Sequence, residues 1–184
     1  VETALNEHAI LAHALLSDLV VMARDGAHAR ARRGLIEHVL FQAGRPMLLV
    51  PQKPKERGWR RALIGWNAKP QAMRAVSAAL PILRQAEEVV VATVDARPSA
   101  AGHGEAPGHD LGAYLARHGV TTHVRNVDSL GRTHAAALVD QAQADRADVL
   151  VLGAYGHSKA REFLFGGVTR ELLEASPVPL FLAH

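Results

Sequence analysis

The chain has no cysteine, few aromatic residues and no long apolar run. Without cysteine among its 184 residues it forms no disulfide, which agrees with the cytoplasmic location that we expect. Aromatic residues make up 4%, and the net charge of +3 comes from scattered basic residues, so we expect no nucleic-acid partner. No segment approaches the roughly 18 consecutive apolar residues of a membrane span, and we expect no membrane association or secretory signal.

What the chain does have is a regular alternation of strand-like and helix-like segments from residue 61 onward. Met73, Val76, Leu80 and Leu83 lie on one face of a helix predicted over 70–85, which Pro81 is expected to end or kink. Such alternation is typical of a parallel sheet with right-handed crossovers. The other predicted elements are strands at 62–66, 88–94, 121–126, 149–153 and 179–183, and helices at 111–118, 132–145 and 167–175.

The first 50 residues repeat the end of this pattern. SDLVVM at 17–22 resembles ADVLVL at 147–152, and PMLLV at 46–50 resembles PLFLA at 179–183. Helices are predicted over 4–16 and 31–41. We therefore interpret 1–50 as the second half of a related, degenerate domain, 51–60 as a linker and 61–184 as a complete domain.

A glycine-rich stretch, GAYGHSKAREFLFGG, lies between the strand at 149–153 and the helix at 167–175. Free backbone N–H groups and the partial positive charge of a helix N-terminus favour anions there, phosphate above all. The stretch lacks the Gly-Lys-Ser/Thr of a P-loop and the G-x-G-x-x-G of a dinucleotide fold. The sequence thus predicts an anion-binding loop of another kind.

The spacing of Gly153, Gly156 and Gly166 resembles the G-x2-G-x9-G signature of the universal stress protein family. The resemblance covers 61–184 in element order and 1–50 as a partial second copy, as in a shortened tandem member. It implies an α/β, Rossmann-like fold of the adenine nucleotide hydrolase type. Its five-stranded, parallel, doubly wound sheet would have the order 3-2-1-4-5, with a ligand crevice where the order reverses.

The resemblance also implies ATP, ADP or AMP as ligand, with Mg²⁺ possible alongside the nucleotide. Adenine would lie against the end of the first strand, and the loop amides would face ribose and phosphates. Tyr155 would either pack on the ribose or anchor the loop. The implied nucleotide-binding residues are Gly65, Trp66, Asn67, Val94, Leu152, Gly153, Tyr155, Gly156, Gly166, Gly167, Val168 and Thr169.

Two positions depart from the family pattern. Gly167 stands where the family has Ser or Thr, so a hydroxyl contact to a phosphate is lost. Thr169, two residues later, would supply a hydroxyl in its place. Asn67 stands where the family usually has Asp, and it still offers a donor and an acceptor. In the first copy Ala23 replaces the first glycine, so we expect that copy to bind nothing.

The function implied is a stress-response module that binds an adenine nucleotide and signals by its occupancy. No nucleophile or general-base motif is present, so we expect at most weak ATP hydrolysis. The alternative is a nucleotide-free protein acting only through dimerisation and protein contacts. Strands 47–50 and 180–183 are expected to pair antiparallel within the chain, while the open flank of 19–23 predicts a homodimer.

Overall fold

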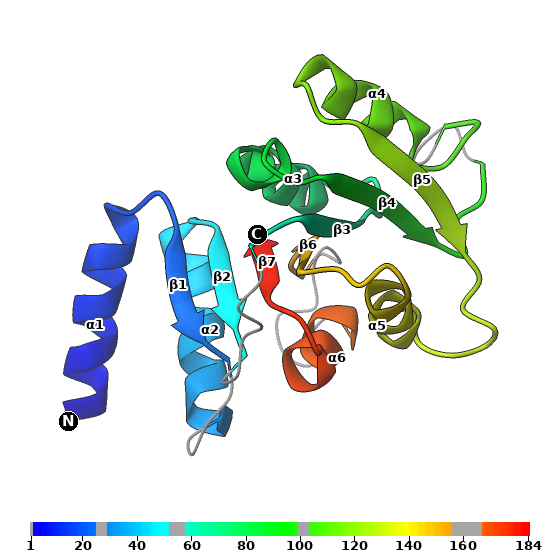
Figure 1. Ribbon diagram of the computed structural model, residues 1–184. Helices are drawn as coiled ribbons and strands as arrows, with labels where there is room; N and C mark the ends of the chain where they lie inside the picture. Colours follow the sequence, from blue (N-terminus) through cyan, green and yellow to red (C-terminus); the bar gives the residue numbers. More distant parts are fainter. Residues whose placement is uncertain (1, 25–28, 52–57, 99–103, 156–166) are drawn as a thin grey trace.

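The computed structural model describes residues 2–24, 29–51, 58–98, 104–155 and 167–184. In these ranges seven strands form one sheet in the order β1-β2-β7-β6-β3-β4-β5 (Figure 1). The strands are β1 (Val20–Ala23), β2 (Met47–Val50), β3 (Arg61–Gly65), β4 (Glu88–Val94), β5 (Thr122–Val127), β6 (Val149–Gly153) and β7 (Leu180–Ala183). The helices are α1 (Glu2–Leu15), α2 (Ala29–Ala43), α3 (Pro70–Leu83), α4 (His109–Arg117), α5 (His134–Ala144) and α6 (Gly167–Ala175).

Five of these strands form the parallel sheet expected from the alternating pattern. Read from the far edge, β5-β4-β3-β6-β7 has the predicted order, and all four of its neighbouring pairs are parallel. In β4 and β6 the successive residues Val89–Ala92 and Val149–Leu152 are all buried. Continuous burial of this kind needs a layer on each face, which explains why these strands lack polar alternation.

The sheet is larger than the five strands predicted, because β1 and β2 join it through β7. β2 runs antiparallel to β7, with Leu48 opposite Phe181, whereas β1 runs parallel to β2. The expected pairing of the two edge strands within the chain is therefore confirmed. Met47, Leu49, Leu180 and Leu182 are fully buried at this junction, so the seam has a continuous apolar core.

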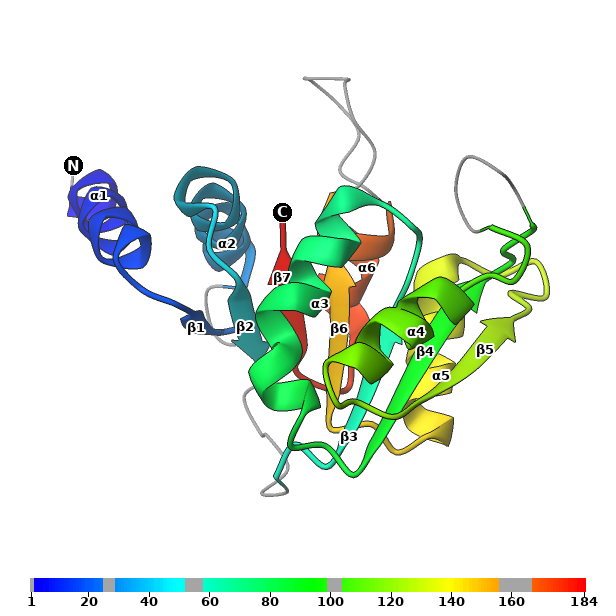
Figure 2. The same cartoon turned by 90° about the horizontal axis from the view of Figure 1, so that it is seen from above.

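Two layers of helices cover the sheet unequally. α3 and α4 lie on one face, and α1, α2, α5 and α6 lie on the other (Figures 1 and 2). Each layer has its own core cluster, and the side chains of one strand alternate between the two. Among the described residues no helix covers β1 on the α3 side, where Val21 is 60% exposed.

Every helix except α6 differs from its predicted bounds by one or two residues at one or both ends. Pro81 does not break α3, which continues to Leu83, since a proline in the last turn costs few hydrogen bonds and Leu83 is buried. α4 begins two residues before the predicted start at 111, directly after Gly108, which has φ +85°. α5 begins later than predicted because Thr133 caps it, its Oγ1 accepting the Ala136 N–H at 3.1 Å.

No helix in the described ranges is long and apolar enough to cross a membrane.

Candidate functional site

A cavity of about 250 Å³ opens at the carboxyl ends of β3, β4 and β6. β3 leads to α3 on one face of the sheet and β6 leads to α6 on the other. The cavity therefore lies at the switch point where open α/β sheets bind ligands. Its lining comprises Gly65, Trp66, Asn67, Lys69, Ala92, Val94, His134, Leu138, Leu152, Gly153, Gly167, Val168 and Thr169.

Three helices begin at this cavity. Lys69 is the N-cap of α3, His134 is the first residue of α5, and Gly167 is the first residue of α6. None of these helices has an acidic residue in its first turn. Their partial positive charges therefore add to the charge of Lys69, and the cavity favours an anionic group.

Gly153 is required by the close approach of β6 to the start of α3. A Cβ added at this position would lie 2.3 Å from the backbone nitrogen of Ala72 and 2.5 Å from the carbonyl carbon of Gln71. Only glycine allows this separation, because both neighbouring atoms belong to the backbone. The first glycine of the loop thus fixes the helix that supports one wall of the cavity.

Asn67 is held beside the cavity by a local turn. Its side-chain oxygen Oδ1 accepts the Lys69 N–H at 3.2 Å, and Ala68 between them has φ +53°. The preceding Trp66 donates its N–H to the Ala92 carbonyl at 2.8 Å, which continues the β3–β4 ladder. This turn brings β3 into α3 and presents Lys69 to the cavity.

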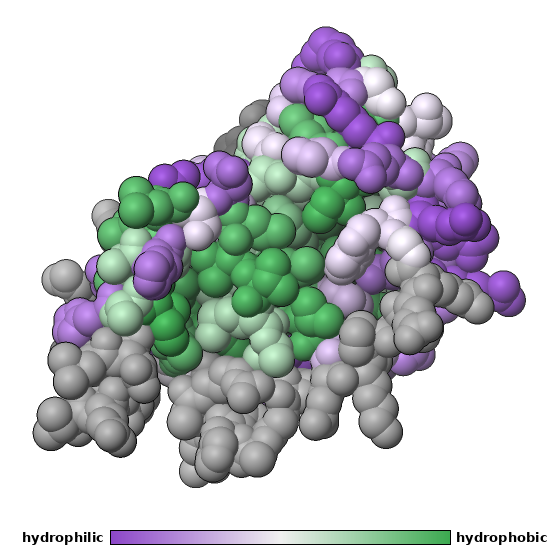
Figure 3. Space-filling model, turned by 60° about the vertical axis from the view of Figure 1, so that its left-hand side comes forward, coloured by the Kyte–Doolittle hydropathy of each residue, from purple (hydrophilic) through white to green (hydrophobic). Residues whose placement is uncertain are grey.

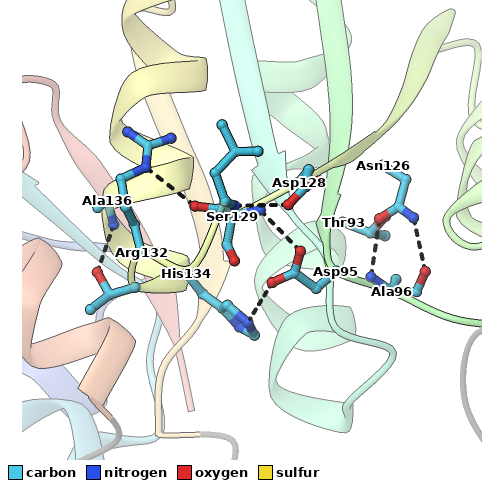
Figure 4. A network of polar contacts seen from close by, with 11 residues as sticks. Thr93, Asp95, Ala96, Asn126, Asp128, Ser129, Arg132, His134 and Ala136 are labelled. Carbon is cyan, nitrogen blue, oxygen red and sulfur yellow. Dashed lines mark hydrogen bonds and ion pairs between the residues drawn. The ribbon is translucent and has the colours of Figure 1, made fainter.

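A polar network closes the side of the cavity formed by the end of β4 and the start of α5 (Figure 4). The His134 Nε2 lies 3.4 Å from the Asp95 Oδ2, and the Asp95 Oδ1 accepts the Ser129 N–H at 2.9 Å. Hydrogen bonds from Ser129 lower the pKa of Asp95, and the nearby His134 lowers it further. The carboxylate therefore stays charged and holds the His134 ring at the cavity.

Asn126 of β5 holds the end of β4 in the same network (Figure 4). Its Oδ1 accepts the Thr93 hydroxyl at 2.9 Å and the Ala96 N–H at 3.1 Å, and its Nδ2 donates to the Ala96 carbonyl at 2.8 Å. These bonds fix the backbone that follows Val94, a residue of the cavity wall. The β4 end is thus held from the side opposite the cavity.

Tyr155 follows β6 but its side chain lies away from the cavity. The hydroxyl donates to the Glu37 Oε1 of α2 at 3.1 Å, and burial together with Glu37 raises the pKa of Tyr155 well above its usual value. Its backbone N–H donates to the Thr169 Oγ1 at 3.2 Å. Of the two roles considered for Tyr155, the geometry favours the loop anchor over contact with a ribose.

Most of the predicted site residues meet at the cavity. The nine that line it are Gly65, Trp66, Asn67, Val94, Leu152, Gly153, Gly167, Val168 and Thr169. Tyr155 is not among the lining residues, and Gly156 and Gly166 lie outside the described residues.

Four lining residues were not predicted from the sequence: Lys69, Ala92, His134 and Leu138. A positional signal exists for two of them. Lys69 directly precedes the helix-starting Pro70, and His134 directly follows the capping Thr133. Leu138 lies one turn after His134 on the same face of α5. Among the described residues no group of three His, Asp or Glu side chains is arranged to hold a metal ion.

The fold and the cavity define a doubly wound α/β protein with a ligand-sized hollow at the carboxyl ends of its strands. The sequence profile of the universal stress protein family matches residues 58–184. Because the match covers well over half of the chain, the protein belongs to the universal stress protein family. No curated protein matches the chain.

Solved structures of the family share the fold. A universal stress protein from Archaeoglobus fulgidus DSM 4304 is similar, with a TM-score of 0.73, 16% identity and coverage of 96% of this chain. The chain spans 64% of that structure's length. A putative universal stress protein from Pseudomonas aeruginosa UCBPP-PA14 has a TM-score of 0.58 and 14% identity, over 95% of this chain and 66% of its own. A universal stress protein in complex with cAMP has a TM-score of 0.52 and 23% identity, over 70% of this chain and 99% of its own.

Proposed function

We propose that the chain binds an adenine nucleotide in this cavity and acts as a nucleotide-dependent signalling module in the stress response. The observation that carries the proposal is the convergence of Lys69 and the N-termini of α3, α5 and α6 on one hollow at the sheet's switch point. Such a site attracts the negative charge of phosphate groups. ATP, ADP and AMP all carry that charge beside a purine.

The walls of the cavity suit the purine. Val94, Leu138 and Leu152 offer apolar surface, and Asn67 offers a polar group at its edge. The volume of about 250 Å³ is slightly below that of typical ligand pockets, which measure about 300–1,000 Å³. We therefore expect the cavity to enclose base and ribose, with the phosphates at the first turn of α6 and, for ATP, Mg²⁺ beside them. A relative of the same fold is in complex with cAMP, which is also an adenine nucleotide.

Isothermal titration of the chain, stripped of co-purified ligand, with ATP, ADP and AMP tests this function. Lys69→Met is expected to weaken ATP binding by about one to two orders of magnitude, because a charge-assisted contact contributes about 1.5–3 kcal/mol. Arg117→Met removes the same charge from the exposed side of α4, outside the cavity, and is expected to leave the affinity unchanged. Absence of heat with all three nucleotides would instead favour the alternative, a nucleotide-free interaction protein.

We also propose that residues 1–50 are a partial copy of the family domain, 51–60 a linker and 61–184 the complete domain. β1, α2 and β2 repeat the order strand–helix–parallel strand of β6, α6 and β7. The antiparallel β2–β7 junction relates the two sets by an approximate twofold axis near Leu48 and Phe181. We expect this first copy to bind no nucleotide, because Ala23 stands where the complete copy has Gly153.

A homodimer is the assembly that this architecture favours. β1 is an edge of the sheet, Val21 on it is 60% exposed, and Leu16 just before it is 90% exposed. Figure 3, which brings this side of the molecule forward, shows an apolar area across its middle. Apolar edges of this kind pair with other chains, and a second copy would cover the edge symmetrically.

A further inference from the structure

Tyr155 connects the N-terminal part of the chain with the candidate nucleotide site. Its side chain is only 8% exposed, and its ring lies 4.8 Å from the ring of Phe41 between centroids. Its hydroxyl donates to the Glu37 carboxylate at 3.1 Å. Glu37 and Phe41 both belong to α2, one turn apart, so a single helix face holds the Tyr155 side chain.

The backbone of Tyr155 contacts a residue of the cavity wall. Its N–H donates to the Thr169 Oγ1 at 3.2 Å, and Thr169 is 4% exposed and lines the cavity in the first turn of α6. Tyr155 also has φ +57°, a left-handed conformation that a bulky residue keeps only where its surroundings impose it. The contacts with Glu37 and Phe41 of α2 are part of these surroundings.

Other contacts from the N-terminal part reach α6, the residue just after it and the residue that follows β7. The Arg33 guanidinium lies 2.6 Å from the Glu174 carboxylate of α6, and the Arg24 Nη1 donates to the Ser176 carbonyl just after α6 at 2.5 Å. The Phe41 ring also meets the His184 ring edge-on at 4.5 Å. Through these contacts α2 and the end of β1 hold α6 in place beside β6.

We propose that Glu37 and Phe41 are positioning residues for the nucleotide site in the other part of the chain. They hold Tyr155, Tyr155 holds Thr169, and the first turn of α6 keeps the geometry that receives the phosphates. The inference rests on the proposed nucleotide binding and gives the incomplete first copy a role in it. By linkage, a nucleotide that binds this geometry also tightens the contact between α2 and Tyr155.

Titration of the whole chain with ATP tests the proposal. Tyr155→Phe and Glu37→Met are each expected to weaken ATP binding about threefold to tenfold. The double variant is expected to bind ATP no more weakly than either single variant, because Phe removes the donor and Met removes the acceptor of the same hydrogen bond. Tyr114→Phe and Glu105→Met are the matched controls, since both side chains lie outside the cavity lining and away from α2, and their affinities are expected to match the unchanged chain.

Melting temperatures without ligand separate positioning from stability alone. A lower melting temperature at unchanged affinity in the Tyr155 and Glu37 variants would overturn the positioning role while leaving nucleotide binding intact. Failure of the unchanged chain to bind ATP would overturn the proposed function together with this inference. Hydrogen exchange of the unchanged chain requires no variant: ATP is expected to slow exchange in α2, and unaltered exchange at saturating ATP would overturn the coupling.

Discussion

Gly153 illustrates how the absence of one side chain shapes the candidate site. The sequence assigned this glycine to a phosphate-binding loop, yet its strongest constraint is the backbone of α3, 2.3 Å from where a Cβ would lie. Gly167 is different, since a Cβ there would meet nothing within 4 Å. A glycine motif therefore combines residues kept for helix packing with residues that leave room beside a ligand.

Gly153→Ala is expected to destabilise the fold by about 1–3 kcal/mol, as overpacking does, because backbone atoms of α3 must move. Gly34→Ala is the control. Gly34 is exposed inside α2 with nothing within 4 Å of an added Cβ, so this change is expected to stabilise by about 0.5–1 kcal/mol. Urea unfolding of both variants measures the difference. Equal stability of the two would contradict the packing role of Gly153.

Asp95 makes stability depend on pH in the acid range. Hydrogen bonds from Ser129 and the nearby His134 lower its folded pKa below the ordinary 3.8. A lowered folded pKa stabilises the fold above the unfolded value, and this contribution is lost as the pH falls through the folded pKa. Asp95→Asn keeps the oxygen acceptor for the Ser129 N–H but removes the charge. We expect the urea midpoints of the two proteins to differ at pH 7 and to converge once the pH falls below the lowered pKa of Asp95. A gap of constant size would refute the assignment.

Between elements, Asp148 ties the start of β6 to the start of β3. Its Oδ2 accepts the backbone N–H groups of Arg60 at 3.0 Å and Arg61 at 2.9 Å. Asp148 thus links two strands that are neighbours in the sheet but far apart in the sequence. Asp18, at the matching place before β1, is exposed and makes no such bond among the described residues. The sequence symmetry of the two residues therefore does not extend to their contacts.

Asp148→Ala is expected to cost about 1–3 kcal/mol, because two N–H groups lose their acceptor. Asp18→Ala is the matched control and is expected to change stability by less than about 0.5 kcal/mol. Thermal or urea unfolding measures both. A cost for Asp18→Ala as large as that for Asp148→Ala would show that the repeat is energetically symmetric after all.

Strand positions were predictable to a large extent because their apolar runs are continuous. The bounds of β4, β6 and α6 agree with the prediction residue for residue. The antiparallel β2–β7 junction was predictable because two apolar edge strands in one chain can form backbone hydrogen bonds with each other. Helix starts were harder to predict from the sequence. A cap such as Thr133 fixes the start by a hydrogen bond from its side chain, and the spacing of apolar residues does not reveal such a bond.

The side chains of the site were predictable only where a motif marked them. His134 reaches the cavity because Asp95, 39 positions earlier in the sequence, holds its ring (134 − 95). Tyr155 leaves the cavity because Glu37 and Phe41 approach it from a helix more than 100 positions away. Both outcomes depend on long-range packing, which no local pattern in the sequence carries.

At the scale of the whole molecule, one edge of the sheet is better protected than the other. β5 is flanked by α4 and carries alternating exposed residues, whereas β1 has no helix over its Val21 side among the described residues. Leu16 and Val21 place apolar surface at that less protected edge. Burying such surface contributes about 25 cal/mol per Å², which favours association once both copies contribute it.

Val21→Lys is therefore expected to shift the chain from dimer to monomer, because a lysine on an edge strand opposes pairing with another chain. His123→Lys, on β5 at the opposite edge of the sheet and exposed, adds a charge there and is expected to leave the dimer intact. Light scattering coupled to gel filtration at tens of micromolar measures both masses. A clean monomer for the unchanged chain would refute the homodimer, and a dimer that persists in Val21→Lys would place the interface away from β1.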